Sequence, residues 1–279
     1  MKARLQLHFE LRNGRTTMRL GDQQPPWRVI RAFPQENGAA LVHLHNVSGG
    51  VLADDDLHLH IAVGPHARAQ VTSTGATRIY RHREGSAESA QTTSISVAEG
   101  GLLEYLPDPL IPFAGSRHRQ TTRIALAQRA TLFGWEVIAP GRQAMGERFR
   151  YDKLRLATRI ESPAGPVLLE DLLLQPAAAS LLSPARLGEY THTATFYAIQ
   201  AGRSTSDLLE LERRLSEIAA RESRQGCTIW GASALAFDGV VVKGLSTSAH
   251  SIPATLAGFW TTARQFLSGD APVPPRKLK

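Results

Sequence analysis

The feature that most constrains this chain is an alternation of apolar and polar residues with a period of two. Asp56–Val63 is the clearest case: its apolar residues alternate with His58 and His60, and a Gly-Pro turn follows. Successive side chains of a strand point to opposite faces, so this pattern predicts a half-buried strand. Arg4–Leu11 alternates in the same way and runs into Asn-Gly, a strong signal for a hairpin turn.

The same strand pattern recurs through the first two-thirds of the chain, with turns that carry Gly, Pro or Asn between many of the strands. The further predicted strands are Ala40–His45, Ala67–Thr72, Gln91–Val97, Gly101–Leu106, Gln120–Leu126, Thr131–Ile138, Leu154–Ile160 and Val167–Leu174. Three similar turn phrases, at Val63–Ala67, Val97–Gly101 and Leu126–Ala130, lie about 30 residues apart and suggest layered hairpins or coils. We therefore predict a mainly β core over residues 1–200, either a sandwich or layered strands resembling a β-helix.

The last third of the chain predicts a small α/β appendage with about two helices. The first helix begins near Asp207, where Asp207 and Glu210 form a pair like a capping box, and the second spans Pro253–Leu267. Between them, Thr228–Phe237 and Gly239–Leu245 read as a hairpin. We expect residues 201–270 to form a helix-hairpin-helix unit packed on the core, and residues 271–279 to form a flexible tail.

Both predicted helices carry apolar stripes that a single chain must either cover itself or share with another protein. Leu208, Leu211 and Leu215 lie on one face of the first helix, and Trp260 lies on the second. We expect part of these stripes to be exposed in the isolated chain and to bind a partner protein.

Composition narrows the class of protein. The single cysteine, Cys227, excludes an internal disulfide and a multi-cysteine metal site, and its apolar neighbours predict a buried thiol. Only five of the 32 basic residues are lysines, and the net charge is +7. The arginines are scattered without basic runs or stacking motifs, which favours acidic protein partners over nucleic acid. No apolar run approaches the ~20 residues that cross a membrane, and the N-terminus lacks a signal-peptide core, so we expect a cytoplasmic protein.

Two His-x-His pairs are candidate metal contacts. His43 and His45 share one strand face, and His58 and His60 share another, as a metal site would require. Apolar residues occupy the opposite faces, so the histidines are expected to face solvent. A plain solvated strand face, a contact to nickel or zinc, and a contact to a partner all fit the pattern.

Several carboxylates are candidates for a second kind of site. Asp54, Asp55 and Asp56 are adjacent and repel one another, so they are solvated, paired with arginine or bound to a cation. Glu136 and Glu170 interrupt otherwise apolar strands, where an ionised carboxylate is costly unless it is paired. Structural ion pairs and acids that line a hydrated passage look the same in sequence.

Five segments, in order and at matching spacing, resemble the UreD family of urease accessory proteins, called UreH in some systems. The segments that carry the resemblance are Asn46–Leu57, Thr72–Arg81, Leu103–Pro107, the stretch from Phe133 to Phe149, and the pair Val241–Leu245 and Phe259–Arg264. The chain departs from the family pattern at Ala53, where a glycine is usual, and at Pro109 and Ala114, which replace two carboxylates. Leu169-Glu170-Asp171 keeps the family's acid and lacks its base.

The resemblance implies a non-enzymatic scaffold with a layered β fold that helps to insert nickel into urease. It implies that the protein bridges the urease apoprotein to the accessory proteins UreF and UreG, with no tightly bound cofactor and transient Ni²⁺ at most. It further implies an internal route for nickel, for which Asp55, Glu136 and Glu170 are our candidates. The alternative is a β-rich hydrolase that uses the paired acids, or zinc held by the histidine pairs.

Overall fold

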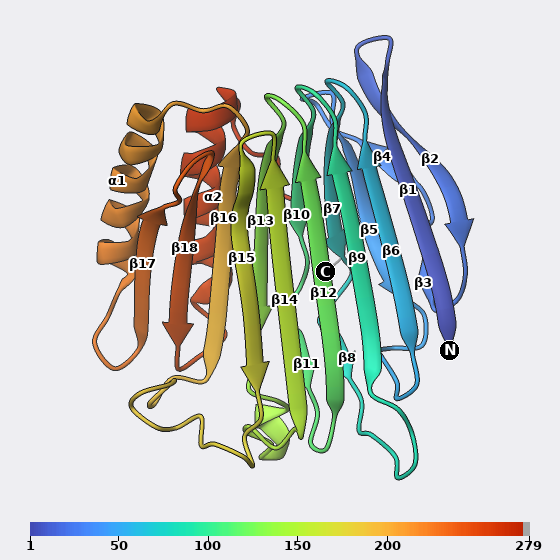
Figure 1. Cartoon of the computed structure of the whole chain (residues 1–279), viewed down its shortest axis with the longest axis vertical. Helices are drawn as coiled ribbons and strands as arrows, with labels where there is room; N and C mark the ends of the chain where they lie inside the picture. Colours follow the sequence, from blue (N-terminus) through green and yellow to red (C-terminus); the bar gives the residue numbers. More distant parts are fainter. Residues whose placement is uncertain (276–279) are drawn as a thin grey trace.

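Two large β-sheets lie face to face in this chain, and two helices cover the outer side of one of them (Figure 1). The structure, a computed structural model, describes residues 1–275, so the last four residues of the expected tail lie outside the described part. The mainly β prediction is confirmed, including the two C-terminal helices. Within residues 1–275, no helix is long and apolar enough to cross a membrane.

The first sheet has seven strands in the order β15-β14-β12-β9-β6-β1-β2. Its members are β1 (Lys2–Arg12), β2 (Arg15–Gln23), β6 (Asp56–Val63), β9 (Ser89–Val97), β12 (Arg117–Leu126), β14 (Lys153–Ser162) and β15 (Gly165–Leu174). Its five central strands, from β14 to β1, are all parallel to one another, and no register shift interrupts the pairings between them.

The second sheet has eleven strands, with the main order β17-β18-β16-β13-β10-β7-β5-β3. Its members are β3 (Trp27–Arg28), β4 (Ala32–Pro34), β5 (Ala40–Asn46), β7 (Arg68–Ser73), β8 (Thr77–Ile79), β10 (Leu102–Leu106), β11 (Leu110–Pro112), β13 (Thr131–Ile138), β16 (His192–Gln200), β17 (Thr228–Ala234) and β18 (Gly239–Ser246). The helical elements are the short 3-10 helix η1 (Gln143–Met145), α1 (Thr205–Glu222) and α2 (Ile252–Ser268).

The recurring turn phrases mark the places where the chain passes from one sheet to the other. The chain runs from β6 to β7, from β9 to β10 and from β12 to β13, so each coil gives one strand to each sheet. A left-handed residue sits in each of these turns: His66, Gly100 and Arg129. At Gly100 a Cβ atom would lie 2.5 Å from the His66 ring, so the close approach of two successive coils requires glycine there. The expected layered coils are therefore present inside a sandwich.

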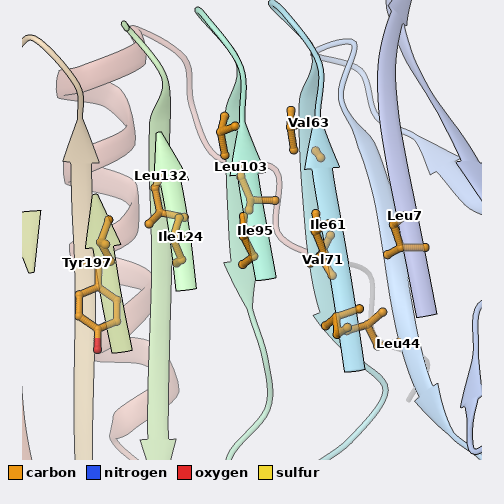
Figure 2. Packing of buried hydrophobic residues seen from close by; sticks show 14 of the residues in the cluster. Leu7, Leu44, Ile61, Val63, Val71, Ile95, Leu103, Ile124, Leu132 and Tyr197 are labelled. Carbon is orange, nitrogen blue, oxygen red and sulfur yellow. The ribbon is translucent and has the colours of Figure 1, made fainter. Parts of the chain in front are cut away.

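The main core fills the space between the two sheets. Leu7, Ile61, Ile95 and Ile124 point inward from the seven-stranded sheet and meet side chains such as Leu132 from the other sheet (Figure 2). Burying a side chain of this size contributes roughly 1.5–3 kcal/mol. The alternation read from the sequence therefore assigns the inner and outer faces correctly.

The C-terminal segment adds two strands to the eleven-stranded sheet and covers its outer side with both helices. β18 pairs with β16, and β17 forms the edge of the sheet. Helix α1 begins two residues before Asp207, because the hydroxyl of Ser204 is the cap and accepts a hydrogen bond from Asp207 N at 3.2 Å. The expected helix-hairpin-helix order is thus α1, then β17 and β18, then α2.

The apolar stripes of the helices pack inside the chain, which corrects the expectation that part of them is exposed for a partner. Leu208, Leu211, Leu215 and Trp260 are all at most 2% exposed. They lie against the outer side of the eleven-stranded sheet, where Leu211, Leu215 and Trp260 belong to a second hydrophobic core. Cys227 is a second correction, because it sits in the turn before β17 and its side chain is exposed.

A buried ion pair fastens α2 to the sheet beneath it. Glu104 on β10 and Arg264 on α2 are 2% and 1% exposed, and Arg264 Nη1 donates to Glu104 Oε1 at 2.8 Å. Trp260 Nε1 donates to the same oxygen at 3.0 Å, and Gln70 Nε2 donates to the other at 2.7 Å. Gln70 also donates to the carbonyl of Val273 at 3.0 Å, which attaches the described end of the chain to this cluster.

Candidate functional site

A cavity of about 310 Å³, lined by both polar and apolar side chains, lies inside the sandwich, between the two sheets. Its walls are β9, β12 and β14 on one side and β7, β10, β13 and β16 on the other. Near one end it is bounded by the loops that carry Gly49–Gly50 and Gly75–Arg78, where Gly49, Gly75 and Arg78 are exposed. The cavity thus extends from loops at the surface into the interior.

The cavity exists because some strands place polar side chains at inward positions. On β12, the inward positions run from Ile124 through Thr122 to Gln120, so the row changes from apolar to polar toward one end of the sheet. Gln91 on β9 and Thr158 on β14 add an amide and a hydroxyl to the same wall. Buried polar groups need hydrogen-bonding partners. A hydrated interior satisfies that need where apolar packing would not.

Two acids, Asp108 and Glu136, line the cavity, and Glu136 is the one that the sequence singled out. Its strand, β13, points Leu132, Gly134 and Glu136 inward, and the carboxylate accepts a hydrogen bond from Gln120 Nε2 at 3.2 Å. Burial, the larger cause, and the negative charge of Glu170 raise the pKa of Glu136 to about 7, against the opposing effect of the ammonium of Lys243. A carboxyl group with this pKa exchanges its proton close to neutral pH.

Glu136 and Thr158 also line a second, more open hollow of about 600 Å³ at the side of the molecule. This hollow lies where the seven-stranded sheet ends at β15 while β16 and β18 continue the other sheet. Glu170 and Lys243 belong to its lining. Because the cavity and the hollow share two residues, Glu136 stands between the interior and this second surface.

Glu170 is held by two partners on the opposite sheet. Tyr197 Oη donates to Glu170 Oε2 at 2.9 Å, and the ammonium of Lys243 forms a salt bridge with Glu170 Oε1. Burial and the charges of Glu136 and Glu170 raise the pKa of Tyr197 well above its ordinary value, so its hydroxyl keeps its proton. Glu170 is 22% exposed and Lys243 is 60% exposed, so this pair faces the hollow. The structure thus brings Glu136 and Glu170 into one site.

Asp55 lies elsewhere. Its side chain is 4% exposed; Oδ1 accepts from the amino group of Met1 at 3.1 Å, and Oδ2 accepts from Leu52 N at 2.8 Å. Asp55 is not among the residues that line the cavity or the hollow. In the structure, this acid fastens the N-terminus to the turn before β6.

The two other aspartates of the triplet also have local partners. Asp54 has a positive φ of 64° and its Oδ1 accepts from Ala87 N at 2.6 Å. Asp56 Oδ1 lies 3.2 Å from His58 Nε2. Neither is part of the cavity lining.

The two histidine pairs lie on opposite outer faces of the sandwich. His58 and His60 are on the outer face of β6, where His60 lies 6.0 Å from His8 between ring centroids. His43 and His45 are on β5 of the other sheet, and the His43 ring lies 5.8 Å from Phe33. The two pairs are therefore not brought together. Within residues 1–275, no group of three or more His, Cys, Asp or Glu side chains is arranged to hold a metal ion.

Several residues of the cavity were not among the sequence candidates. They are Gln91, Gln120, Thr158, Tyr105, Tyr197 and Asp108, and Lys243 is a further such residue in the hollow. Gln120 and Thr122 are in phase with Ile124 and Leu126, so a polar continuation of the inward row was visible in the sequence. Lys243 carried no such signal, because its partner Glu170 is 73 residues away.

The geometry does not fit the hydrolase alternatives. Paired-acid hydrolysis needs two carboxylates that face each other across an open cleft. Here Glu136 and Glu170 both line the hollow, but Glu136 accepts a hydrogen bond from Gln120 and Glu170 is held by Lys243 and Tyr197, so neither is free to act on a substrate. A zinc site that combines both histidine pairs is excluded by their placement on opposite faces.

Comparison with known proteins identifies the family. The family model described as "UreD urease accessory protein" matches residues 1–278. This chain belongs to the UreD family. A urease accessory protein UreD of Herpetosiphon aurantiacus is 42% identical over 278 residues, covering 100% of this chain and 96% of that protein. UreD proteins of Sorangium cellulosum and Escherichia coli are each 32% identical, covering 92% and 98% of this chain and 78% and 95% of theirs.

Membership gives this UreD chain a role in urease maturation, as an accessory protein without catalytic activity of its own. Its partners are accordingly proteins of the urease system.

Proposed function

We propose that this UreD protein is a cytoplasmic scaffold that bridges the urease apoprotein to UreF and UreG and conducts nickel through its interior to the apoprotein. The observation that carries the nickel route is the interior cavity, lined by Asp108 and Glu136, of which Glu136 also lines the hollow at the side of the molecule. Nickel is cargo in this proposal, bound transiently and released.

The lining suits a hydrated cation in transit. Amide oxygens of Gln91 and Gln120 and the hydroxyl oxygen of Thr122 can bond the water shell of the ion, and they are weak ligands by themselves. Histidine and cysteine, which hold nickel tightly, are not part of this lining. A passage built from such groups favours movement over storage.

Glu136 supplies a charge where the cavity and the hollow meet. A cation that arrives there displaces a proton near neutral pH, because the pKa of this carboxyl is about 7. The fixed ammonium of Lys243 neutralises Glu170 next to it. The ion therefore meets one available carboxylate instead of two, which limits how tightly it is retained.

The experiment compares three variants in a urease-positive host in which the native gene has been deleted. Glu136→Gln removes the charge where the cavity meets the hollow, and Thr158→Leu adds bulk at the same place. Thr158→Val is the matched control, because it keeps the volume of threonine. Soluble UreD, its pull-down with UreF and apoprotein, and nickel per urease active site are measured for each.

We expect the first two variants to stay soluble and bound in the complex but to yield nickel-poor urease, while Thr158→Val activates urease normally. Full nickel loading with both Glu136→Gln and Thr158→Leu would refute the passage and leave the scaffold role alone. Active, fully metallated urease in the deletion strain would refute the scaffold role as well.

A further inference from the structure

The outer face of the seven-stranded sheet is a broad surface that no other element of residues 1–275 covers (Figure 1). Its central strands, from β1 to β14, are parallel and in unbroken register, so their outward side chains form straight rows across the sheet. Many of these residues are small, and the following list gives those of the central strands: Ala62, Ala90, Thr92, Ser94, Ser96, Thr121, Ala125 and Ala157. Small side chains on a regular sheet make a flat, rigid surface.

Basic residues gather on this face over β12 and β14. Arg117, Arg119, Arg123, Lys153, Arg155 and Arg159 occupy six of the ten outward positions of these two strands, and Glu161 is the one acid among them. The register sets Arg119 directly beside Arg155 and Arg123 directly beside Arg159. Neighbouring strands lie about 4.8 Å apart, and like charges at that spacing repel.

Four of the six basic residues have acidic partners. Arg155 pairs with Asp171 and Arg159 with Glu161, while Arg117 pairs with Asp152 and Lys153 with Glu88. Arg119 and Arg123 are exposed and form no salt bridge with any residue in the described range 1–275. The guanidinium groups of Arg119 and Arg123 therefore have no counter-ion within that range and lie beside those of Arg155 and Arg159.

A trough runs across the same face beside these arginines. One part, of about 380 Å³, lies between His60 on β6 and Arg123 and Arg159 on β12 and β14. The adjoining part, of about 560 Å³, reaches His8 on β1. The two parts share Ser96 and Ala125, whose small side chains form the floor.

We propose that this face, centred on Arg119 and Arg123, docks an acidic surface of a partner protein, with Asp or Glu side chains of the partner on the free guanidinium groups. Arginine forms planar, bidentate pairs with carboxylates and is enriched in protein interfaces. The trough between His60 and Arg159 gives room for side chains that project from the partner. The rigid sheet holds the two free guanidinium groups in place before binding.

The distribution of charge favours a protein over a nucleic acid. Asp56, Glu161 and Asp171 lie on the same face and would repel a phosphate backbone. The central strands present no outward Phe, Tyr or Trp on which a base could stack. Mixed charges with two free arginines match the polar part of a protein interface instead.

The test measures binding of the full-length chain to urease apoprotein, and in parallel to poly-L-glutamate, at low and moderate salt. The choice of apoprotein rests on the proposed function, whereas poly-L-glutamate probes the face independently of it. The variant Arg119→Glu with Arg123→Glu is compared with a control of the same charge change, Arg28→Glu with Arg83→Glu, two exposed arginines without salt bridges. Circular dichroism and thermal melting verify that both variants are folded.

We expect the double variant on the face to bind apoprotein roughly 100-fold more weakly than wild type and to lose most of the salt dependence, while the control stays within a few-fold. Equal weakening of both variants, or none in either, overturns the proposal. So does wild-type protein that binds neither probe.

Two further outcomes would assign the face to another occupant and overturn the proposal. One is binding of duplex DNA or RNA that depends on Arg119 and Arg123 in the same way. The other is self-association of the wild type that the face variant does not show. If the wild type binds poly-L-glutamate through Arg119 and Arg123 but does not bind apoprotein, the face still docks an acidic surface. Apoprotein is then refuted as the partner. The proposal and the proposed function can therefore fail separately.

Discussion

Replacing Glu136 with glutamine removes a group whose protonation changes between the folded and the unfolded chain. In the folded protein the pKa of this carboxyl is raised from 4.5 to about 7. Between these values the folded protein keeps a proton that the unfolded chain releases. The stability linked to this proton is fully present below pH 4.5, falls as the pH rises, and is lost above pH 7.

The size of the effect follows from the size of the shift. One unit of pKa corresponds to about 1.4 kcal/mol, so the raised pKa of Glu136 is worth at most about 3 kcal/mol over the full range. Between pH 5.5 and pH 8 the linked loss is about 2 kcal/mol of unfolding free energy. Contact of the carboxyl with water in the cavity reduces this value, because hydration favours the ionised form.

Urea unfolding followed by tryptophan fluorescence at pH 5.5, 6.5, 7.5 and 8 measures the difference. We expect wild type to lose about 2 kcal/mol relative to Glu136→Gln over this range, with a step centred between pH 6 and 7. Glu84→Gln, at an exposed turn residue, is the control for the loss of one carboxylate. In Lys243→Met the step should move to higher pH, because the ammonium of Lys243 lowers the pKa of Glu136.

Parallel pH profiles of wild type and Glu136→Gln would refute this reasoning. They would mean that Glu136 is ionised in the folded protein at every pH tested. The cavity would then be wet enough to hydrate the carboxylate fully, and the proton exchange described for a passing cation would not take place.

Three further changes test other parts of the structure. Asp55→Asn should lower the free energy of unfolding by about 1–2 kcal/mol, because the buried carboxylate binds the amino group of Met1. Nickel loading per folded UreD should stay normal, and reduced loading by a fully stable variant would return Asp55 to the nickel route. Glu104→Gln alone should cost about 3–5 kcal/mol in urea unfolding by stranding Arg264, and adding Arg264→Met should recover part of the loss. Because the proposed passage leaves room at this junction, Thr158→Leu should lower the free energy of unfolding by less than about 1 kcal/mol, measured by calorimetry with Thr158→Val as the reference. A loss of about 1–3 kcal/mol, as in a packed core, would contradict an open passage.

The sequence predicted the strands and their two faces because both depend on local alternation. Residues 56–63 could be assigned an inner and an outer side without any knowledge of their neighbours. The 30-residue spacing of the turn phrases even indicated coils. The order of strands within each sheet depends on contacts between distant segments, so it came only with the structure.

The candidate site was predictable only in part, for the same reason. Glu136 and Glu170 were singled out because an acid in an apolar strand is costly without a partner. Two other contacts depend on the tertiary fold: the salt bridge of Glu170 with Lys243 and the contact of Asp55 with the amino group of Met1. The stripe on α1 was identified correctly, but the sequence could not show that the chain covers it with its own sheet.

The winding of the chain also has a consequence for its synthesis. Leu5 on β1 lies opposite Leu59 on β6, so the first strand has no parallel neighbour until more than fifty further residues have left the ribosome. Each later coil adds a shorter delay, as between Ile61 and its partner Ile95. Native states dominated by such distant pairings form slowly, and their unpaired strand edges are meanwhile open to wrong association. Overproduction of this chain alone should therefore favour inclusion bodies, and slower translation at low temperature should shift the yield toward native protein.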